Sequence, residues 1–302
     1  MRISVTGTNG FVLKAILNYF KFDNKFQFIS INLRERFLLN KIELGDVCIH
    51  LVGKAHDLKK VSSPNEYYRI NTELTKQMFD VFLVSKAKKF ILLSSVKAVA
   101  DEVQGELVED VVPNPITHYG KSKLLAEQYI LSHTIPENKR VYILRPCMIH
   151  GPGNKGNLNL LYSLVSKGLP WPLGLFENSR SYLSIENLCF IINELIVRED
   201  IPSGVYNVAD DIPLSTNEII NLIAESKDKK ASILKINTTI IKILARVGDF
   251  LNLPLNSERL QKLTESYVVS NAKLKSVLGK PLPISSRDGL RATFKSFSLK
   301  QI

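Results

Sequence analysis

Over the first 150 residues, short runs of Ile, Val, Leu and Phe alternate with amphipathic stretches. This alternation is typical of βαβ units, in which a helix returns the chain to a parallel sheet. One long helix is predicted over residues 65–89 and another over residues 118–133. The apolar runs predict strands over residues 2–6, 26–31, 47–52, 89–94 and 140–145.

After residue 150 the pattern changes to helical segments separated by Pro and Gly. Ser215 and Glu218 have the spacing of a capping box and predict a helix over residues 215–226, preceded by a short strand over 205–209. A helix over residues 238–252 is too short to cross a bilayer. We therefore expect an α/β fold with a Rossmann-like, doubly wound parallel sheet. Residues 1–150 would form it, part of 184–212 would return to it, and 151–302 would mainly form a smaller lobe.

A glycine turn, Thr6–Gly10, joins the first strand directly to a helix-like pattern. Such a turn suits a phosphate group, because helix N-terminal amides and their partial positive charge hold anions. The third glycine of the usual motif is replaced by Leu13, although that glycine permits close packing of helix on strand. We predict that the leucine displaces the helix or turns into another pocket, and that it weakens cofactor binding. Residues 33–45 leave room for one short helix, so the usual third strand is expected to be absent.

Composition narrows the class of protein. Cys48, Cys147 and Cys189 are far apart in the sequence, and the five histidines show no ligand spacing, so neither disulfides nor a metal site is expected. The net charge of +11 comes from dispersed lysines without a nucleic-acid recognition pattern, which indicates solvated surface or an anionic, phosphate-bearing ligand. Without a secretion signal or an apolar run of ~20 residues, a cytoplasmic protein with no membrane span is expected.

The strongest chemical feature is the pair Tyr119 and Lys123, four residues apart on one predicted helix and therefore on one face. A phenol with an ordinary pKa near ~10 is a poor base at neutral pH, and a neighbouring ammonium is predicted to lower that pKa. The pair would act as a proton shuttle. Ser94 and Ser95 end an upstream strand, so a hydroxyl there would share the substrate oxygen with Tyr119. His50 ends another buried strand and is interpreted as structural.

Seven segments resemble, in order and spacing, the extended short-chain dehydrogenase/reductases of the NAD-dependent epimerase/dehydratase family. They are "TGTNGF", "HLVG", Asn71 in "YRINTELT", "LLSS", "YGKSK", "LRPCMIHGPG" and "RSYLSIENL". The resemblance covers nearly the whole chain. It extends to members that act at C4 of UDP-N-acetylhexosamines in the synthesis of surface-polysaccharide sugars. It implies an NAD(P)-binding domain in residues 1–150 and a substrate-binding lobe mainly in 151–302.

The resemblance also implies roles for single residues. Tyr119 would be the acid/base and Ser95 its hydroxyl partner, while Lys123 would lower the Tyr119 pKa and bind the nicotinamide ribose. Asn71 would position the active-site backbone. Residues assigned to cofactor binding are Gly7, Asn9, Gly10, Phe11, Asn32, Arg34, Leu51, Val52, Gly53, Asn71, Tyr119, Lys123 and Pro146. Residues assigned to the UDP-sugar are Ser95, Lys97, Gly156, Asn157, Arg180 and, less firmly, Arg259.

Among the reactions of the family, dehydration is disfavoured because Val96 and Lys97 follow Ser95, where dehydratases carry an Asp-Glu pair. Reduction of a 4-keto sugar and 4-epimerisation both remain. We favour the reductase, because Leu13 and the missing strand suggest loose cofactor retention. A nucleotide-binding regulator without activity is a third interpretation. It is disfavoured because such proteins commonly lose the Tyr or the Lys, and this chain keeps both Tyr119 and Lys123.

The type of nicotinamide cofactor stays open between NAD and NADP. The second strand ends in Asn32 instead of the acidic residue that favours NAD, and Arg34 could reach a 2′-phosphate. Relatives often dimerise through a four-helix face that would include the helix after Tyr119, so a homodimer is an expectation.

Overall fold

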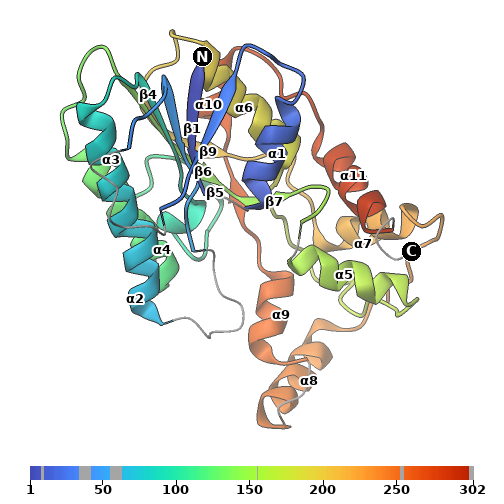
Figure 1. Ribbon diagram of the computed structural model, residues 1–302. Coiled ribbons are helices and arrows are strands. Elements are labelled where there is room, and N and C mark those ends of the chain that lie inside the picture. Colours follow the sequence, from blue (N-terminus) through green and yellow to red (C-terminus); the bar gives the residue numbers. More distant parts are fainter. Residues whose placement is uncertain (8–9, 34–41, 55–62, 155, 252–254, 299–302) are drawn as a thin grey trace.

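Six parallel strands form the central sheet of the protein, in the order β2-β1-β3-β4-β6-β9 (Figure 1). The computed structural model describes residues 1–302 except 8–9, 34–41, 55–62, 155, 252–254, 299–302 and the side chain of Asn157. The strands are β1 Arg2–Thr6, β2 Gln27–Ile31, β3 Val47–His50, β4 Lys89–Leu93, β6 Arg140–Pro146 and β9 Gly204–Val208. The doubly wound, Rossmann-like sheet predicted from the apolar runs is confirmed.

Helices cover both faces of this sheet because the strands are apolar on both sides. All four residues of β3, for example, are buried. On one face, Met78, Phe79 and Phe82 of α3 and Ile130 of α4 pack on the strands. On the other, α1 and α6 pack on the strands within the larger of the two apolar clusters of the sheet, and α10 packs beside β9. The covering helices are α1 Phe11–Tyr19, α3 Leu74–Val84, α4 His118–Leu131, α6 Ile185–Val197 and α10 Ala272–Leu278.

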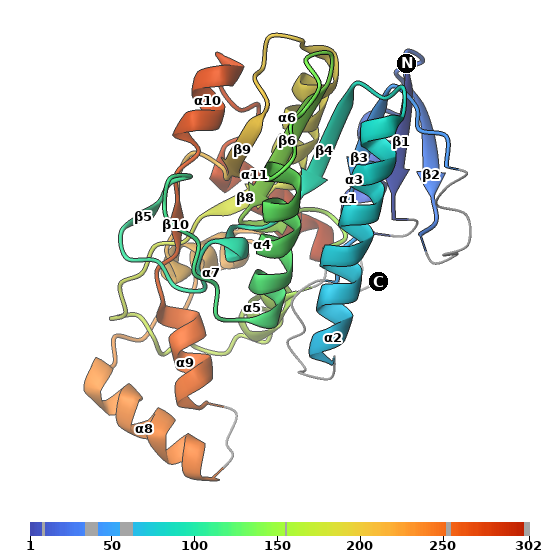
Figure 2. The same ribbon diagram turned by 90° about the vertical axis from the view of Figure 1, so that its left-hand side faces the viewer.

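Helices α5, α7, α8 and α9 lie beyond the carboxyl ends of the strands (Figure 2), and α11 packs on α7 and β8. One apolar cluster joins α5, α7 and α11, and a second joins α7, α8 and α9 around Trp171. The bounds are α5 Asn157–Ser166, α7 Thr216–Glu225, α8 Thr238–Leu251, α9 Ser257–Thr264 and α11 Ser286–Ser298. Two small parallel sheets complete the fold, β5 Glu106–Leu107 with β10 Val268–Val269 and β7 Met148–His150 with β8 Tyr182–Ser184.

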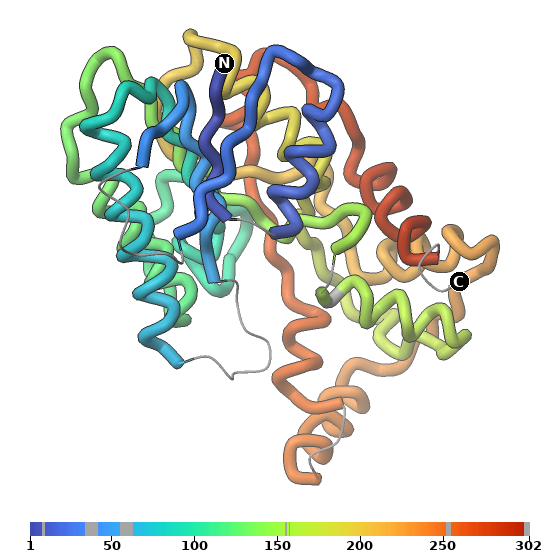
Figure 3. The backbone as a smooth tube through the Cα atoms, viewed as in Figure 1, coloured from blue at the N-terminus to red at the C-terminus, as the bar shows by residue number. Residues whose placement is uncertain are grey.

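The path of the chain explains how this lobe is tied to the sheet (Figure 3). After β9 the chain builds α7, α8 and α9 and then returns along the sheet to α10 before ending in α11. The helix predicted from Ser215 and Glu218 is confirmed, with the reciprocal side-chain bonds of a capping box. No helix in the described part of the chain is long and apolar enough to cross a membrane.

Two predicted elements differ from the structure. The single helix predicted over 65–89 consists of α2 Pro64–Tyr67, a π-helical turn η2 Tyr68–Glu73, and α3, which ends at Val84. The strand predicted over 47–52 stops at His50, because the amides of Leu51 and Val52 donate to Thr6 Oγ1 instead of a neighbouring strand. The usual third strand, expected to be absent, would fall within residues 33–45, and residues 34–41 of that range lie outside the described part of the chain.

Leu13 resolves the question raised by the missing third glycine. Its side chain is buried in the apolar core with Ile3, Val5 and Ile16. Of the two alternatives predicted, the leucine has turned into an apolar pocket and contributes to the packing of α1 on the sheet.

Candidate functional site

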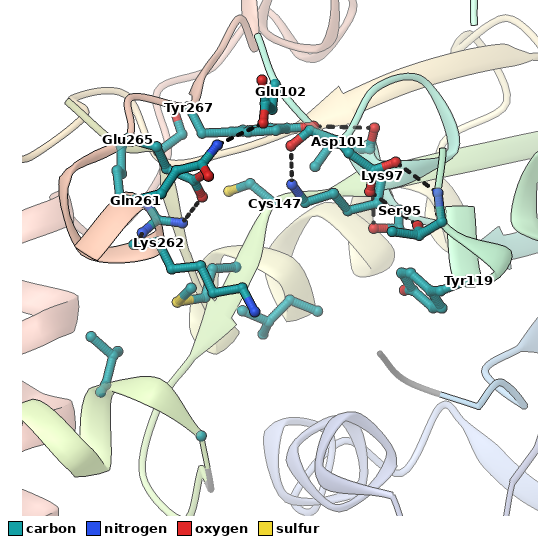
Figure 4. Close-up of a pocket in the computed structure, with 18 of the residues that line it drawn as sticks. Ser95, Lys97, Asp101, Glu102, Tyr119, Cys147, Gln261, Lys262, Glu265 and Tyr267 are labelled. Atoms are coloured by element: carbon teal, nitrogen blue, oxygen red, sulfur yellow. Dashed lines mark hydrogen bonds and ion pairs between the residues drawn. The ribbon is translucent and has the colours of Figure 1, made fainter. Parts of the chain in front are cut away.

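A cavity of about 660 Å³ lies at the carboxyl ends of β4 and β6 (Figure 4). Figure 4 shows Ser95 and Tyr119 on one side of it and Gln261, Lys262 and Glu265 of the lobe on the other. The cavity is lined by Ser95, Val96, Lys97, Asp101, Glu102, Thr117, Tyr119, Cys147, Met148, Ile149, Asn154, Gly156, Leu158, Arg180, Ser181, Glu258, Gln261, Lys262, Glu265 and Tyr267. The sheet domain and the lobe therefore both contribute polar groups to one cavity that is open to solvent.

Ser95 and Tyr119 are brought together as the sequence predicts. Their side chains are hydrogen-bonded, which acts to lower the pKa of Tyr119. Burial acts more strongly in the opposite direction, and the nearby ring of Tyr67 adds to it, so the pKa of Tyr119 is raised above its ordinary value. The phenol therefore keeps its proton at neutral pH and points that proton-bearing group at the cavity.

The two adjacent serines have different environments. Ser94 is buried and donates to Glu127 Oε1, and Glu127 also forms a buried ion pair with Arg145 at 2.6 Å. Ser95 caps the short 3₁₀ turn η3 Val96–Ala98, where its Oγ accepts from the Lys97 amide at 3.2 Å. Only Ser95 lines the cavity, so the structure distinguishes a structural serine from one available to a ligand.

The predicted effect of Lys123 on the Tyr119 pKa stays a prediction. Lys123 Nζ donates to the Leu93 carbonyl oxygen at 3.0 Å, and the hydroxyl of Ser95 is the group that lowers the Tyr119 pKa. Burial lowers the pKa of Lys123 itself to about 8, although the charge of Glu127 acts to raise it. At neutral pH this lysine stays mainly protonated, as its hydrogen bond to the carbonyl oxygen requires.

Lys123 instead meets two other residues predicted to hold the cofactor. A Cβ added at Gly53 would lie 2.9 Å from Lys123 Nζ and 3.4 Å from Asn71 Oδ1, so the three residues adjoin. Asn71 lies in the π-helical turn η2 and is completely buried. Its Nδ2 donates to Ser122 Oγ at 2.9 Å, and its Oδ1 accepts from the Lys54 amide at 2.7 Å. Asn71 thus ties the strand-end loop to α4, and a π-turn is often found at such functional positions.

His50 is structural, as predicted. Thr75 Oγ1 donates its one hydrogen to the Asn71 carbonyl oxygen at 2.7 Å, so it must accept from His50 Nε2 at 3.1 Å. His50 Nδ1 then accepts from Thr6 Oγ1 at 3.0 Å. Burial lowers the pKa of this neutral imidazole to about 3. The chain of hydrogen bonds joins β1, β3 and the π-turn behind the predicted cofactor loop.

The start of α4 is fixed by a carboxylate on the cavity wall. Asp101 accepts from the amides of Ile116 and Thr117 at 2.7 and 3.0 Å and from the Thr117 hydroxyl at 3.0 Å. Thr117 in turn caps the helix by accepting from the Gly120 amide at 3.1 Å. The helix end that carries Tyr119 is therefore held by side chains as well as by packing.

The residues predicted to bind a dinucleotide fit such a group where they are described. Gly7 has a φ of +96°, which turns the chain between β1 and α1, and Gly10 is an N-cap with no side chain to occupy the first amides of α1. Phe11 begins that helix, Leu51 and Val52 follow β3, Asn32 follows β2, and Pro146 ends β6. Asn9 and Arg34 lie outside the described residues.

The predicted substrate residues are only partly gathered at the cavity. Lys97 lines it with Nζ on the Asp101 carbonyl oxygen at 2.6 Å and 4.1 Å from the Tyr267 ring centroid, and burial lowers the pKa of this lysine. Arg180 lines it as well, bonded to the Lys262 carbonyl oxygen at 2.6 Å and to Glu265 at 3.1 Å. Gly156 also lines it as the N-cap of α5. The side chain of Asn157 lies outside the described part.

Arg259 is not among the described residues that line the cavity, although it belongs to α9. The cation that α9 presents there is Lys262, paired with Glu258 at 2.7 Å. Lys262, Gln261, Glu265 and Tyr267 were missed by the sequence reasoning. An exposed, charged helix in the lobe carries no pattern that would select these residues, because only the folded chain brings α9 opposite Tyr119.

Comparison with known proteins agrees with this geometry. A model of the NAD dependent epimerase/dehydratase family matches residues 3–209. The chain is 29% identical over 259 residues to a UDP-glucose 4-epimerase of Vibrio cholerae, covering 83% of this chain and 76% of that protein. It is 26% identical over 246 residues to a GDP-6-deoxy-D-mannose reductase of Pseudomonas aeruginosa, covering 74% and 79%.

Solved structures share the fold. MoeE5 in complex with UDP-glucuronic acid and NAD has a TM-score of 0.75 at 18% identity, over 99% of this chain and 100% of that one. RMD from Pseudomonas aeruginosa complexed with NADPH has a TM-score of 0.73 at 22% identity, over 99% of both chains. In the described residues, no three His, Cys, Asp or Glu side chains gather in a way that could hold a metal ion.

Proposed function

The chain belongs to the NAD-dependent epimerase/dehydratase family, and we propose that it reduces the 4-keto group of a UDP-2-acetamido-6-deoxyhexose. It is an enzyme of NAD(P)-dependent sugar-nucleotide chemistry, as its homologues are. The observation that carries the choice of reduction is the hydrogen-bonded pair of Ser95 and Tyr119, whose raised phenol pKa leaves a proton to donate. A regulator without activity would have no need of this pair.

The chemistry assigned to the chain's own residues is proton transfer to the sugar oxygen. Tyr119 would donate its phenolic proton to O4 as negative charge develops there, and the Ser95 hydroxyl would donate a hydrogen bond to the same oxygen. Because Ser95 already contacts Tyr119, both donors can meet one oxygen atom. Asp101 holds Tyr119 in place beside Ser95, because its hydrogen bonds to Thr117 fix the start of α4.

A bound nicotinamide would supply the hydride that this reaction needs. Gly7, Gly10 and the first amides of α1 would hold its diphosphate, and Lys123, beside Gly53 and Asn71, would bind the ribose. The cofactor is NAD or NADP, in keeping with structures of this fold. The residue that would decide between them, Arg34, lies outside the described part.

The lobe would hold the nucleotide diphosphate. Arg180 reaches the cavity with a planar guanidinium, a geometry that suits phosphate oxygens. The Arg180 guanidinium already forms an ion pair with Glu265, so a diphosphate would compete with that carboxylate for the same N–H donors. Lys97 and Lys262 place two further cations on the wall. These pairings favour an anionic ligand that can replace a carboxylate over a neutral one.

A second candidate function is 4-epimerisation, which the relative from Vibrio cholerae favours. An epimerase needs the same proton transfer in both directions, first from the substrate hydroxyl and then back to the ketone. Tyr119 would have to begin as a base, which its raised pKa opposes. For that reason the reductase is the first proposal.

Product analysis separates the two reactions. The enzyme is incubated with a UDP-2-acetamido-4-keto-6-deoxyhexose and NADPH or NADH, and separately with UDP-GlcNAc and NAD⁺. We expect loss of the reduced nicotinamide absorbance with the ketone and an NMR spectrum of the 4-hydroxy sugar. Formation of UDP-GalNAc from UDP-GlcNAc, with no turnover of the ketone, would replace the reductase by the epimerase. An absence of turnover in both incubations would reject both.

A further inference from the structure

Helix α8 carries more apolar surface than the core of the lobe uses. Ile241, Ala245 and Gly248 form its buried side, and the first two pack with Trp171 and Leu260. Its other large apolar side chains are 45% to 89% exposed, and we call them the α8 apolar face. They are Ile240, Ile243, Leu244, Val247, Phe250 and Leu251.

These six positions form one continuous stripe. They recur at intervals of three and four residues, which places them on a single side of an α-helix along its whole length. Phe250, at 89%, is exposed almost as fully as a side chain can be. In both views α8 lies at the extremity of the lobe, away from the sheet (Figures 1 and 2). The stripe is therefore presented outward at one end of the molecule.

The charges beside the stripe are mainly basic. Lys242 and Arg246 are exposed on α8 itself and Lys235 lies just before it. None of the three has an ion pair with a residue that the structure describes. Asp249, the acidic residue of α8, is engaged by the amide and hydroxyl of Ser257. With a chain charge of +11, this end of the molecule complements an anionic surface.

We propose that α8 binds the surface of an anionic lipid bilayer, with the α8 apolar face in the boundary between headgroups and acyl chains. Lys235, Lys242 and Arg246 would contact the lipid phosphates. A stripe of aliphatic and aromatic side chains flanked by basic residues is the pattern of helices that lie in a membrane interface. This inference goes beyond the proposed reaction and does not depend on it.

A second copy of the chain is a poorer occupant. A two-fold dimer places the same patch on both partners. Pairing of two α8 stripes would therefore bring the Lys242 and Arg246 side chains of both copies to one interface, an accumulation of positive charge that a lipid phosphate layer would instead neutralise. Because α9 follows α8 and supplies Glu258, Gln261 and Lys262 to the cavity, membrane binding would hold that cavity close to the bilayer.

Vesicle flotation tests the proposal with the whole protein. Phosphatidylcholine vesicles with and without phosphatidylglycerol are mixed with the wild type, with Leu244→Ser/Phe250→Ser, with Lys242→Gln/Arg246→Gln and with Phe22→Ser. Phe22 is 88% exposed next to Lys21, so its variant is a matched control for loss of an exposed ring beside a lysine. All substituted side chains are exposed, and circular dichroism checks that each variant folds.

We expect the wild type and Phe22→Ser to float with the anionic vesicles and to bind the neutral ones more weakly. Each α8 double variant should lose affinity for anionic vesicles by about tenfold or more. The proposal is overturned if the wild type does not float with anionic vesicles or if both double variants bind like Phe22→Ser. It is also overturned if sedimentation without lipid shows a dimer that Leu244→Ser/Phe250→Ser abolishes, because a second copy then covers the face.

Discussion

At the scale of single residues, the site combines a buried phenol with one hydroxyl partner. The Tyr119–Lys123 spacing and the strand-end serines could be predicted from the sequence, since both follow from local geometry. The balance of influences on Tyr119 could not. That balance depends on how far the folded chain buries the phenol and on the neighbouring Tyr67.

The proposed role of Ser95 predicts a specific kinetic loss. Ser95→Ala removes a donor to the reacting oxygen and should lower kcat by roughly 10²–10³. It also removes the hydrogen bond that lowers the Tyr119 pKa, so the fall in rate at high pH, where Tyr119 loses its proton, should move to higher pH. Steady-state kinetics across pH measure both effects. Ser95→Thr, which keeps the hydroxyl, should recover much of the rate, and an unchanged kcat for Ser95→Ala would argue against the role.

His50 predicts how stability depends on acidity. Its pKa is about 3 in the folded protein against an ordinary 6.5, so between these values the unfolded chain binds the proton more readily. This contribution to stability is complete above about pH 6.5 and is lost toward pH 3, with a slope of up to about 1.4 kcal/mol per pH unit. Urea unfolding at a series of pH values should show a shallower slope for His50→Asn. Equal slopes would mean that His50 is not the group responsible.

At the scale of elements, apolar periodicity predicted the strands and the main helices because both faces of the sheet are buried. It could not predict the π-turn at Asn71, since an extra residue in one turn leaves the apolar pattern of the flanking helices nearly intact. The end of β3 at His50 likewise could not be predicted. The Leu51 amide donates to the Thr6 hydroxyl instead of to a neighbouring strand, and Thr6 is 45 residues away in the sequence.

Leu13 shows how an element can compensate for a missing glycine. Because its side chain fills the core under α1, Leu13→Gly should destabilise the protein by roughly 3–6 kcal/mol, from the lost burial and the helix propensity of glycine. Denaturant unfolding measures the change. Leu17→Gly on the same helix, where the leucine is 40% exposed, should cost roughly 2 kcal/mol, because less burial is lost. Similar losses in both variants would contradict the packing role.

The weakened cofactor binding predicted from Leu13 stays a prediction. A fluorescence titration of the wild type with NADPH and NADH should give dissociation constants in the micromolar range or weaker. A submicromolar value would show that the leucine does not disturb the diphosphate loop.

At the scale of the whole molecule, function depends on the sheet domain and the lobe meeting at one cavity. The sequence indicates both parts, but it does not show which of their residues face each other. The family resemblance placed Tyr119 and Arg180 in one site, and the structure places both on one cavity. It also brings α9 to that cavity, where Lys262 lines the wall and Arg259 does not. Long-range placement of this kind depends on the packing of α7, α8 and α9 around Trp171, which has no local signature.

The proposed reaction is tested most directly by the rate at which Tyr119→Phe oxidises NADPH with the 4-keto sugar nucleotide. Tyr129→Phe is the matched control, because it removes a hydroxyl from the same helix that is bonded to Asp80 outside the cavity. We predict that Tyr119→Phe loses at least about 10²-fold in kcat while it unfolds like the wild type and Tyr129→Phe keeps full activity. A Tyr119→Phe enzyme that reduces the ketone at the wild-type rate would contradict the account.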